Sequence, residues 1–142
     1  MLSLTLPAQV ENLPMVFTFI LNEARRRGID IYCEPRLELV VEELFVNICR
    51  YAYPSSAHGT VDFLILPPQP ERPSCLQILI RDTGAAFNPL ENTAPDIATP
   101  LQDRRRGGLG IHLVRNLTSA LSYRRNDGTN ELFLEFHMQA EG

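Results

Sequence analysis

The chain has 142 residues, of which 44% are hydrophobic and 21% are charged, and its formal net charge is −4. This length predicts a single domain, residues 1–142, that can bury a substantial core. The negative charge argues against nonspecific nucleic-acid binding, and no apolar run reaches the roughly 20 residues that a membrane helix needs. The three cysteines are widely spaced and the first residues do not resemble a signal peptide, so we expect a cytoplasmic protein that is not bound to a membrane.

The N-terminal third predicts one strand and two helices. Apolar and polar side chains alternate over residues 2–6, which is typical of a strand. Apolar residues then recur at helical spacing over residues 13–24, and Gly28 lies where a helix commonly ends. A second helix is predicted for residues 35–51, because Pro35 suits a first helical turn and Pro54 stops the pattern.

The remainder predicts four strands, a lid and a third helix. Apolar runs at residues 61–66 and 76–80 indicate two strands, and residues 88–106, which are polar and without periodicity, suggest a functional lid. A helix over residues 109–119 precedes two strands joined by a strong hairpin signal, Asn126-Asp127-Gly128. In the last strand four alternating residues form one apolar face: Leu132, Leu134, Phe136 and Met138. The elements predict an α+β fold, a two-layer α/β sandwich whose mostly antiparallel sheet is covered on one face by three helices.

A glycine cluster begins the third predicted helix. The stretch RRRGGLG runs from Arg104 to Gly110. The first N–H groups of a helix lack partners within the helix and its dipole is positive there, so this place suits a phosphate group. The tripeptide of a P-loop and the third glycine of a dinucleotide fingerprint are both missing. The alternative interpretation is a flexible hinge before a helix.

The second predicted helix carries a carboxylate and an amide one turn apart. Helical spacing places Glu43, Asn47 and Arg50 on one shoulder of the apolar stripe, whereas Glu42 faces solvent. An asparagine oxygen can complete a Mg²⁺ shell made of water and phosphate. A glutamate beside it can orient or deprotonate a hydroxyl group. A solvated polar pair is the alternative.

An aspartate and a glycine follow the strand at residues 76–80. Asp82 could accept a hydrogen bond from a ligand amine such as the exocyclic amine of adenine, and Gly84 would allow the turn beneath the ring. An ordinary Asp-x-Gly turn is the alternative interpretation.

These three motifs, in this order and spacing, resemble the N, G1 and G2 boxes of the Bergerat-fold ATPases, a superfamily with gyrase, heat-shock chaperone, mismatch-repair and histidine-kinase nucleotide domains. The resemblance rests on E-x-x-x-N from Glu43, D-x-G-x-x-F from Asp82 and GGLGIHLV from Gly107. Within the superfamily the chain is most similar to the anti-sigma-factor serine/threonine protein kinases. "FNPL" after the second motif, "GGLGIHLVRNL" and the closing "DGTNELFLEF" carry that similarity, which covers roughly residues 3–138.

The resemblance implies a role for each matching residue. Asn47 would coordinate Mg²⁺, Glu43 would act as general base, and Asp82 would bind adenine with Gly84 as its turn partner. The backbone would cradle the phosphates of ATP at four positions: Gly107, Gly108, Leu109 and Gly110. Arginines would assist them: Arg50 could touch a phosphate, and Arg104, Arg105 and Arg106 could reach the γ-phosphate or form a solvated part of the lid.

Two positions depart from the family pattern. Ala86 stands where a second glycine is common in the G1 box. A threonine that is common near the last strand has no unambiguous match, because Thr129 lies beside the expected position.

The resemblance implies an ATP- and Mg²⁺-dependent serine/threonine protein kinase that binds a sigma factor and phosphorylates an anti-sigma-factor antagonist protein. It also implies that homodimers can form. One alternative is an ATP-binding interaction module without kinase activity. Another is the nucleotide-binding half of a split histidine kinase, which would need a phosphoacceptor histidine from a separate chain.

Overall fold

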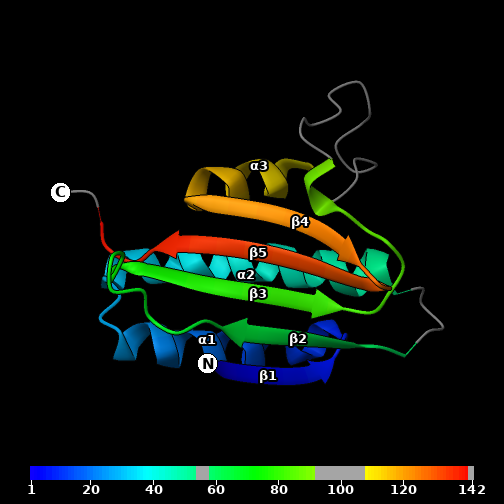
Figure 1. The fold of residues 1–142 in the computed structure, drawn as a ribbon, viewed down its shortest axis with the longest axis horizontal. Helices are drawn as coiled ribbons and strands as arrows, with labels where there is room; N and C mark the ends of the chain where they lie inside the picture. Colours follow the sequence, from blue (N-terminus) through cyan, green and yellow to red (C-terminus); the bar gives the residue numbers. More distant parts are fainter. Residues whose placement is uncertain (54–57, 92–107, 141–142) are drawn as a thin grey trace.

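The computed structural model describes residues 1–53, 58–91 and 108–140. One antiparallel sheet of five strands organises them, in the order β1-β2-β3-β5-β4 (Figure 1). The strands are β1 (Leu2–Pro7), β2 (Thr60–Ile65), β3 (Cys75–Asp82), β4 (Ala120–Asn126) and β5 (Thr129–His137). The prediction of a mostly antiparallel sheet is therefore confirmed.

The predicted hairpin between the last two strands is also confirmed. Asp127 and Gly128 both have positive φ angles, 48° and 78°. A two-residue turn of this handedness matches the twist of the flanking strands, which explains why Asn-Asp-Gly marks the reversal.

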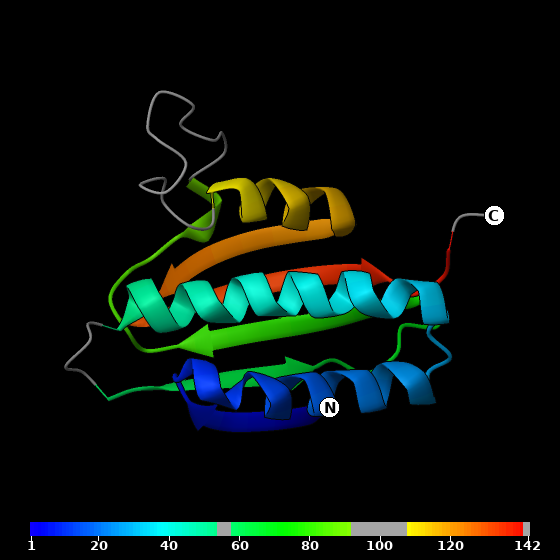
Figure 2. The same ribbon diagram turned by 180° about the vertical axis from the view of Figure 1, so that it is seen from behind.

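Three α-helices of the described chain cover one face of the sheet, as the sequence predicts: α1 (Leu13–Arg26), α2 (Glu34–Asn47) and α3 (Gly108–Leu117) (Figure 2). A proline stands in the first turn of α1 and of α2, where its missing N–H costs no helical hydrogen bond. Gly28, just after α1, has a φ of 89°, a conformation that glycine adopts without a steric penalty. None of the described helices is long and apolar enough to cross a membrane.

The second predicted helix contains a change of hydrogen-bonding pattern that periodicity did not reveal. The α-helix α2 ends at Asn47 and continues as a π-helix, η3 (Ile48–Ala52). The helical segment still ends within one residue of the prediction. Single π-helical turns often occur at functional sites.

The core lies between the helices and the inner face of the sheet. On β3, burial alternates so that Leu76, Ile78, Ile80 and Asp82 are all buried. On β5 the predicted apolar face is buried as expected, and Asn130 begins the same face. Asp82 and Asn130 are paired in register. An apolar face thus ends in a polar pair where β3 ends.

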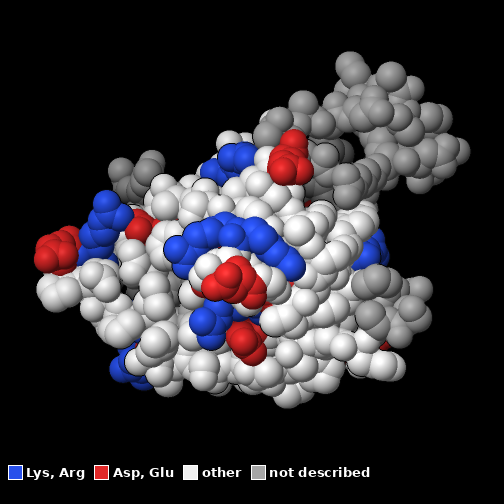
Figure 3. All heavy atoms as spheres, turned by 45° about the vertical axis from the view of Figure 1, so that its right-hand side comes forward, with Lys and Arg blue, Asp and Glu red and all other residues white. Residues whose placement is uncertain are grey.

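The other face of the sheet carries no helix in the described part of the chain. Charges alternate on it across neighbouring strands, from Asp62 to Arg81, Glu131 and Arg124. Figure 3 shows positive and negative side chains interleaved on this side of the molecule.

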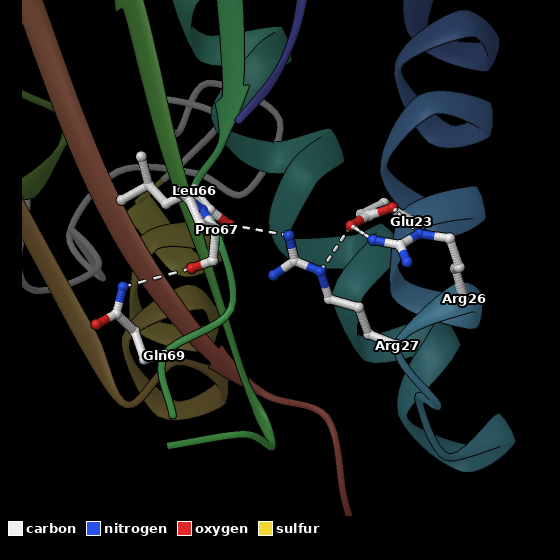
Figure 4. Close-up of polar contacts among 6 residues, drawn as sticks. All are labelled: Glu23, Arg26, Arg27, Leu66, Pro67 and Gln69. Carbon is white, nitrogen blue, oxygen red and sulfur yellow. Dashed lines mark hydrogen bonds and ion pairs between the residues drawn. The ribbon is translucent and has the colours of Figure 1, made fainter. Parts of the chain in front are cut away.

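At the end of the molecule opposite Asp82, ion pairs at the end of α1 position an arginine that is hydrogen-bonded to the connection after β2 (Figure 4). Glu23 binds both Arg26, at 2.6 Å, and Arg27, at 2.7 Å. Arg27 also donates to the carbonyl oxygen of Leu66, at 2.9 Å. The side chains of Glu23 and Arg27 are only 5% and 8% exposed, so they join helix and loop inside the structure.

Part of the predicted lid falls outside the described residues. Residues 89–91 form a short 3₁₀ helix, η4 (Pro89–Glu91). The described chain resumes at Gly108, where α3 begins.

Candidate active site

The predicted carboxylate–amide pair on α2 is formed. The side-chain nitrogen Nδ2 of Asn47 donates to Oε1 of Glu43 at 3.3 Å. Asn47 is only 3% exposed and Glu43 is half-buried, whereas Glu42 is exposed as predicted. Because Asn47 is buried, the interpretation of a freely solvated pair is wrong for this residue. Within the described chain no contact uses Oδ1 of Asn47, which leaves an oxygen able to bind a cation.

The carboxylate of Glu43 lies against the first turn of α3. A methyl group at Gly110 would lie 2.1 Å from Cδ and 2.2 Å from Oε1 of Glu43. Only glycine therefore permits this approach. The contact brings the motif of α2 together with the start of the third helix, which is positively polarised.

Asp82 is buried at the end of β3, with 4% of its surface exposed. Its Oδ1 accepts from the Gly84 N–H at 3.0 Å and from Nδ2 of Asn130 at 2.8 Å. Burial raises the pKa of the Asp82 carboxyl, while these two hydrogen bonds and the charge of Arg125 act in the opposite direction. Among the contacts of the described residues, none uses Oδ2 of Asp82. One oxygen is therefore saturated and the other is available to a ligand.

The turn after Asp82 packs directly on the π-helix. The carbonyl oxygen of Ala52 accepts from the Ala85 N–H at 2.7 Å. A Cβ atom at Gly84 would lie 2.3 Å from that oxygen, so only glycine fits at this position. The end of the helix that carries Glu43 and Asn47 is thus fastened to the turn that carries Asp82.

Tyr53 adds a second link between the same elements. Its hydroxyl donates to the carbonyl oxygen of Thr60 at 2.7 Å and accepts from the Thr83 N–H at 3.0 Å. The rings of Tyr51 and Phe87 also meet, with centroids 5.3 Å apart. Sequence reasoning assigned no role to Tyr53, because an aromatic residue after a helix carries no motif.

Asn130 is the second residue that the motifs missed. It is 3% exposed and contacts Asp82 directly, whereas the neighbouring Thr129 is only partly buried at the start of β5. The available signal was the period of two, because Asn130 continues the face of Leu132 and Leu134 as a polar residue on a buried face.

The other predicted site residues are only partly placed. Arg50 is exposed in the π-helix, and among described residues it forms no hydrogen bond or ion pair with Glu43 or Asn47. The prediction that Arg50 lies beside Glu43 and Asn47 used the spacing of an α-helix, which does not apply there because a π-helix contains more residues per turn. Gly108 and Leu109 form the start of α3, while Gly107 and residues 104–106 lie outside the described residues.

The chain is similar to known proteins over most of its length. A family model described as "Histidine kinase-like ATPase domain" matches residues 6–136. The chain is 32% identical to the "Serine/threonine-protein kinase BtrW" of Bordetella bronchiseptica over 105 residues, 74% of this chain and 71% of that protein. It is 24% identical to the "Serine-protein kinase RsbW" of Halalkalibacterium halodurans over 131 residues, 89% of this chain and 77% of that protein.

Two solved structures share the fold. The histidine kinase domain of the Erythrobacter litoralis EL346 blue-light activated histidine kinase has a TM-score of 0.55 and 18% identity, covering 94% of this chain and 62% of that one. A structure of the blue-light activated histidine kinase itself has a TM-score of 0.54 and 17% identity, covering 78% of this chain and 32% of that one. The chain therefore spans about a third of that kinase. The match over residues 6–136 and the relative with 32% identity establish that the chain belongs to the histidine kinase-like ATPase domain family.

Proposed function

We propose that the protein is an ATP- and Mg²⁺-dependent serine/threonine protein kinase that binds a sigma factor and phosphorylates an anti-sigma-factor antagonist protein in the cytoplasm. The observation that carries the proposal is the meeting of Glu43, Asn47 and the start of α3 at one place. Two relatives are a serine/threonine-protein kinase and a serine-protein kinase, which supports the kinase class.

The adenine end of the site fits its expected ligand. Asp82 is buried with Oδ1 occupied by two donors, and within the described chain Oδ2 lacks a donor. Oδ2 can therefore accept a hydrogen bond from a ligand amine. The exocyclic amine of adenine would supply that bond.

The phosphate end requires a cation. Glu43 already places negative charge beside the start of α3, where the phosphates are expected. Phosphate oxygens would be repelled by this carboxylate unless a divalent ion neutralised them. Asn47 would hold Mg²⁺ through Oδ1, together with phosphate oxygens and water, because Mg²⁺ commonly uses one or two protein ligands beside a nucleotide. When bound, the ion would neutralise charge on the phosphates.

Glu43 would act as the general base. In the proposed reaction the partner's serine or threonine oxygen forms a bond to the γ-phosphorus, and the bond from the γ-phosphorus to the bridging oxygen breaks to release ADP. Glu43 takes the hydroxyl proton, while Asn47 fixes the carboxylate through its 3.3 Å hydrogen bond. The N–H groups at the start of α3 would donate to the phosphates.

A pair of adjacent glutamates provides a test of this assignment. Glu43→Gln removes the base but keeps the side-chain shape, whereas Glu42→Gln changes an exposed neighbour on the same helix. Transfer of ³²P from ATP to the antagonist protein should fall roughly 100-fold or more in Glu43→Gln and remain normal in Glu42→Gln. Calorimetry should show that both variants still bind ADP.

The same experiment separates the alternatives. Equal transfer rates in wild type and Glu43→Gln would refute the base assignment, and no transfer by a wild type that binds ADP would favour an interaction module. Acid-labile phosphate on the partner would indicate phosphohistidine and a split histidine kinase instead. If ATP and ADP both fail to bind the folded protein, the whole proposal fails.

The partners require a separate measurement. Affinity capture from the native cytoplasm, with and without ATP, should recover a sigma factor and the antagonist protein, with nucleotide changing their proportions. Recovery of neither protein under both conditions would contradict the proposed regulatory role.

A further inference from the structure

Asn130 is the centre of a buried hydrogen-bond network beside Asp82. The two residues face each other in register on β5 and β3. Asn130 forms five hydrogen bonds with described residues. A buried amide with this many partners is held in one orientation.

The nitrogen side of the amide faces acceptors. Nδ2 of Asn130 donates to Oδ1 of Asp82 and to the carbonyl oxygen of Ala85, both at 2.8 Å. Both N–H bonds of the amide are therefore used. One of them fixes the carboxylate, and the other fixes the turn that follows it.

The oxygen side of the amide faces donors. Oδ1 of Asn130 accepts from the Tyr123 hydroxyl at 2.5 Å, from Nη1 of Arg125 at 3.1 Å and from the Phe87 N–H at 3.3 Å. A flipped amide would set its oxygen against a carboxylate and its nitrogen against these donors. These three donors, two of which lie on β4, therefore determine that the nitrogen end of the Asn130 amide faces Asp82.

This arrangement determines what Asp82 can offer a ligand. Because Oδ1 of Asp82 holds two donors, rotation of the carboxylate would break both hydrogen bonds. Oδ2 is consequently presented as an acceptor. An oxygen that acts as an acceptor can bind an amine N–H, whereas it is repelled by a carbonyl oxygen.

We propose that Asn130 is a positioning residue that sets the base selectivity of the site. By saturating Oδ1 of Asp82 and leaving Oδ2 as an acceptor, it favours a purine with an amine at position 6 over one with a carbonyl there. This inference rests on the proposed nucleotide-binding function.

The test compares the binding of ADP and inosine diphosphate (IDP) by calorimetry. Wild type should prefer ADP by roughly 100-fold, because a site built to accept from an amine rejects the carbonyl analogue. Asn130→Ala should weaken ADP binding roughly 10-fold or more and change IDP binding little, so that the ratio of the two dissociation constants narrows. Asn126→Ala, an exposed asparagine in β4, is the matched control and should keep both affinities.

The ratio of the IDP and ADP dissociation constants distinguishes a positioning role of Asn130 from a general structural role. A structural role alone would weaken both nucleotides by the same factor, and an unchanged ratio in Asn130→Ala would overturn the inference. Tyr123→Phe, which removes one hydroxyl from the network, should reduce the preference for ADP over IDP roughly 2- to 5-fold. If Asn130→Ala does not fold, Tyr123→Phe decides the question, and an unchanged ratio there overturns the inference. Failure of wild type to bind either nucleotide would instead refute the proposed function.

Discussion

At two positions of the site, neighbouring atoms leave no room for a Cβ atom, so each position holds a glycine. The neighbouring atoms differ between the two positions. At Gly110 the obstacle to a larger side chain is the end of the Glu43 side chain, which can move. At Gly84 it is the backbone oxygen of Ala52, which cannot move without displacing the π-helix. Gly110 therefore allows the carboxylate of Glu43, the proposed general base, to lie against α3. Gly84 allows the turn after β3 to pack against the π-helix.

Substituting these glycines should separate activity from stability. Gly110→Ala forces the Glu43 carboxylate away from α3, while alanine favours a helix by about 1 kcal/mol over glycine. We expect the free energy of unfolding to change by less than about 1 kcal/mol, and phosphoryl transfer to fall roughly 10-fold or more. Gly84→Ala should instead lower the free energy of unfolding by about 2 kcal/mol or more. Denaturant titration measures the free energy of unfolding of both variants, and the transfer assay measures their activity. A fully active Gly110→Ala would contradict the proposed importance of the contact between Glu43 and α3 for phosphoryl transfer.

At the level of elements, periodicity predicted most of the sheet and all three helices of the described chain. It could not predict the π-helix after Asn47, because apolar spacing determines which face is buried and not the hydrogen-bonding pattern of one turn. The period of two places Asn130 on the buried face, but the family motif has a threonine in this region, and the neighbouring Thr129 drew attention away from Asn130. Glu43, Asn47 and Asp82 were predictable because their spacing is local to one helix or one turn.

The ion pairs at the end of α1 should make stability depend on pH. Arg26, by its hydrogen bond, and then Arg27 lower the pKa of Glu23 to about 2, against burial, which raises it. Because the pKa in the folded state is below the usual 4.5, the stabilisation is complete above about pH 4.5 and is lost as the pH falls toward 2.

Glu23→Gln should therefore lower the free energy of unfolding at pH 7 by about 2–4 kcal/mol, because Arg27 would remain buried without its partner charge. The difference from wild type should shrink in urea titrations as the pH approaches 2. Glu131→Gln, which breaks a pair with the exposed Arg124, is the control and should cost less than about 1 kcal/mol. A difference at Glu23 that did not vary with pH would show that the ion pairs are not its source.

At the level of the whole molecule, the helices and the sheet share one cluster of buried side chains. A ligand that contacts Asp82, α2 and α3 should therefore stabilise the whole fold. ADP at 100 times its dissociation constant should add about 2.7 kcal/mol and raise Tm by about 5–10 °C. Asp82→Asn should largely abolish this increase in differential scanning calorimetry, because the amide oxygen would take the place of Oδ1 beside its two donors and an NH₂ group would replace the acceptor Oδ2. An equal ADP-dependent increase in that variant would argue that adenine lies elsewhere.

The hydrogen bond between Ala52 and Ala85 has a mechanical consequence. It joins main chain to main chain, so it does not depend on the side chain at either position. A displacement of α2 would therefore also displace the turn after Asp82, the residue that we propose binds adenine. A partner protein that binds this helix would thereby act on both ends of the proposed nucleotide site at once.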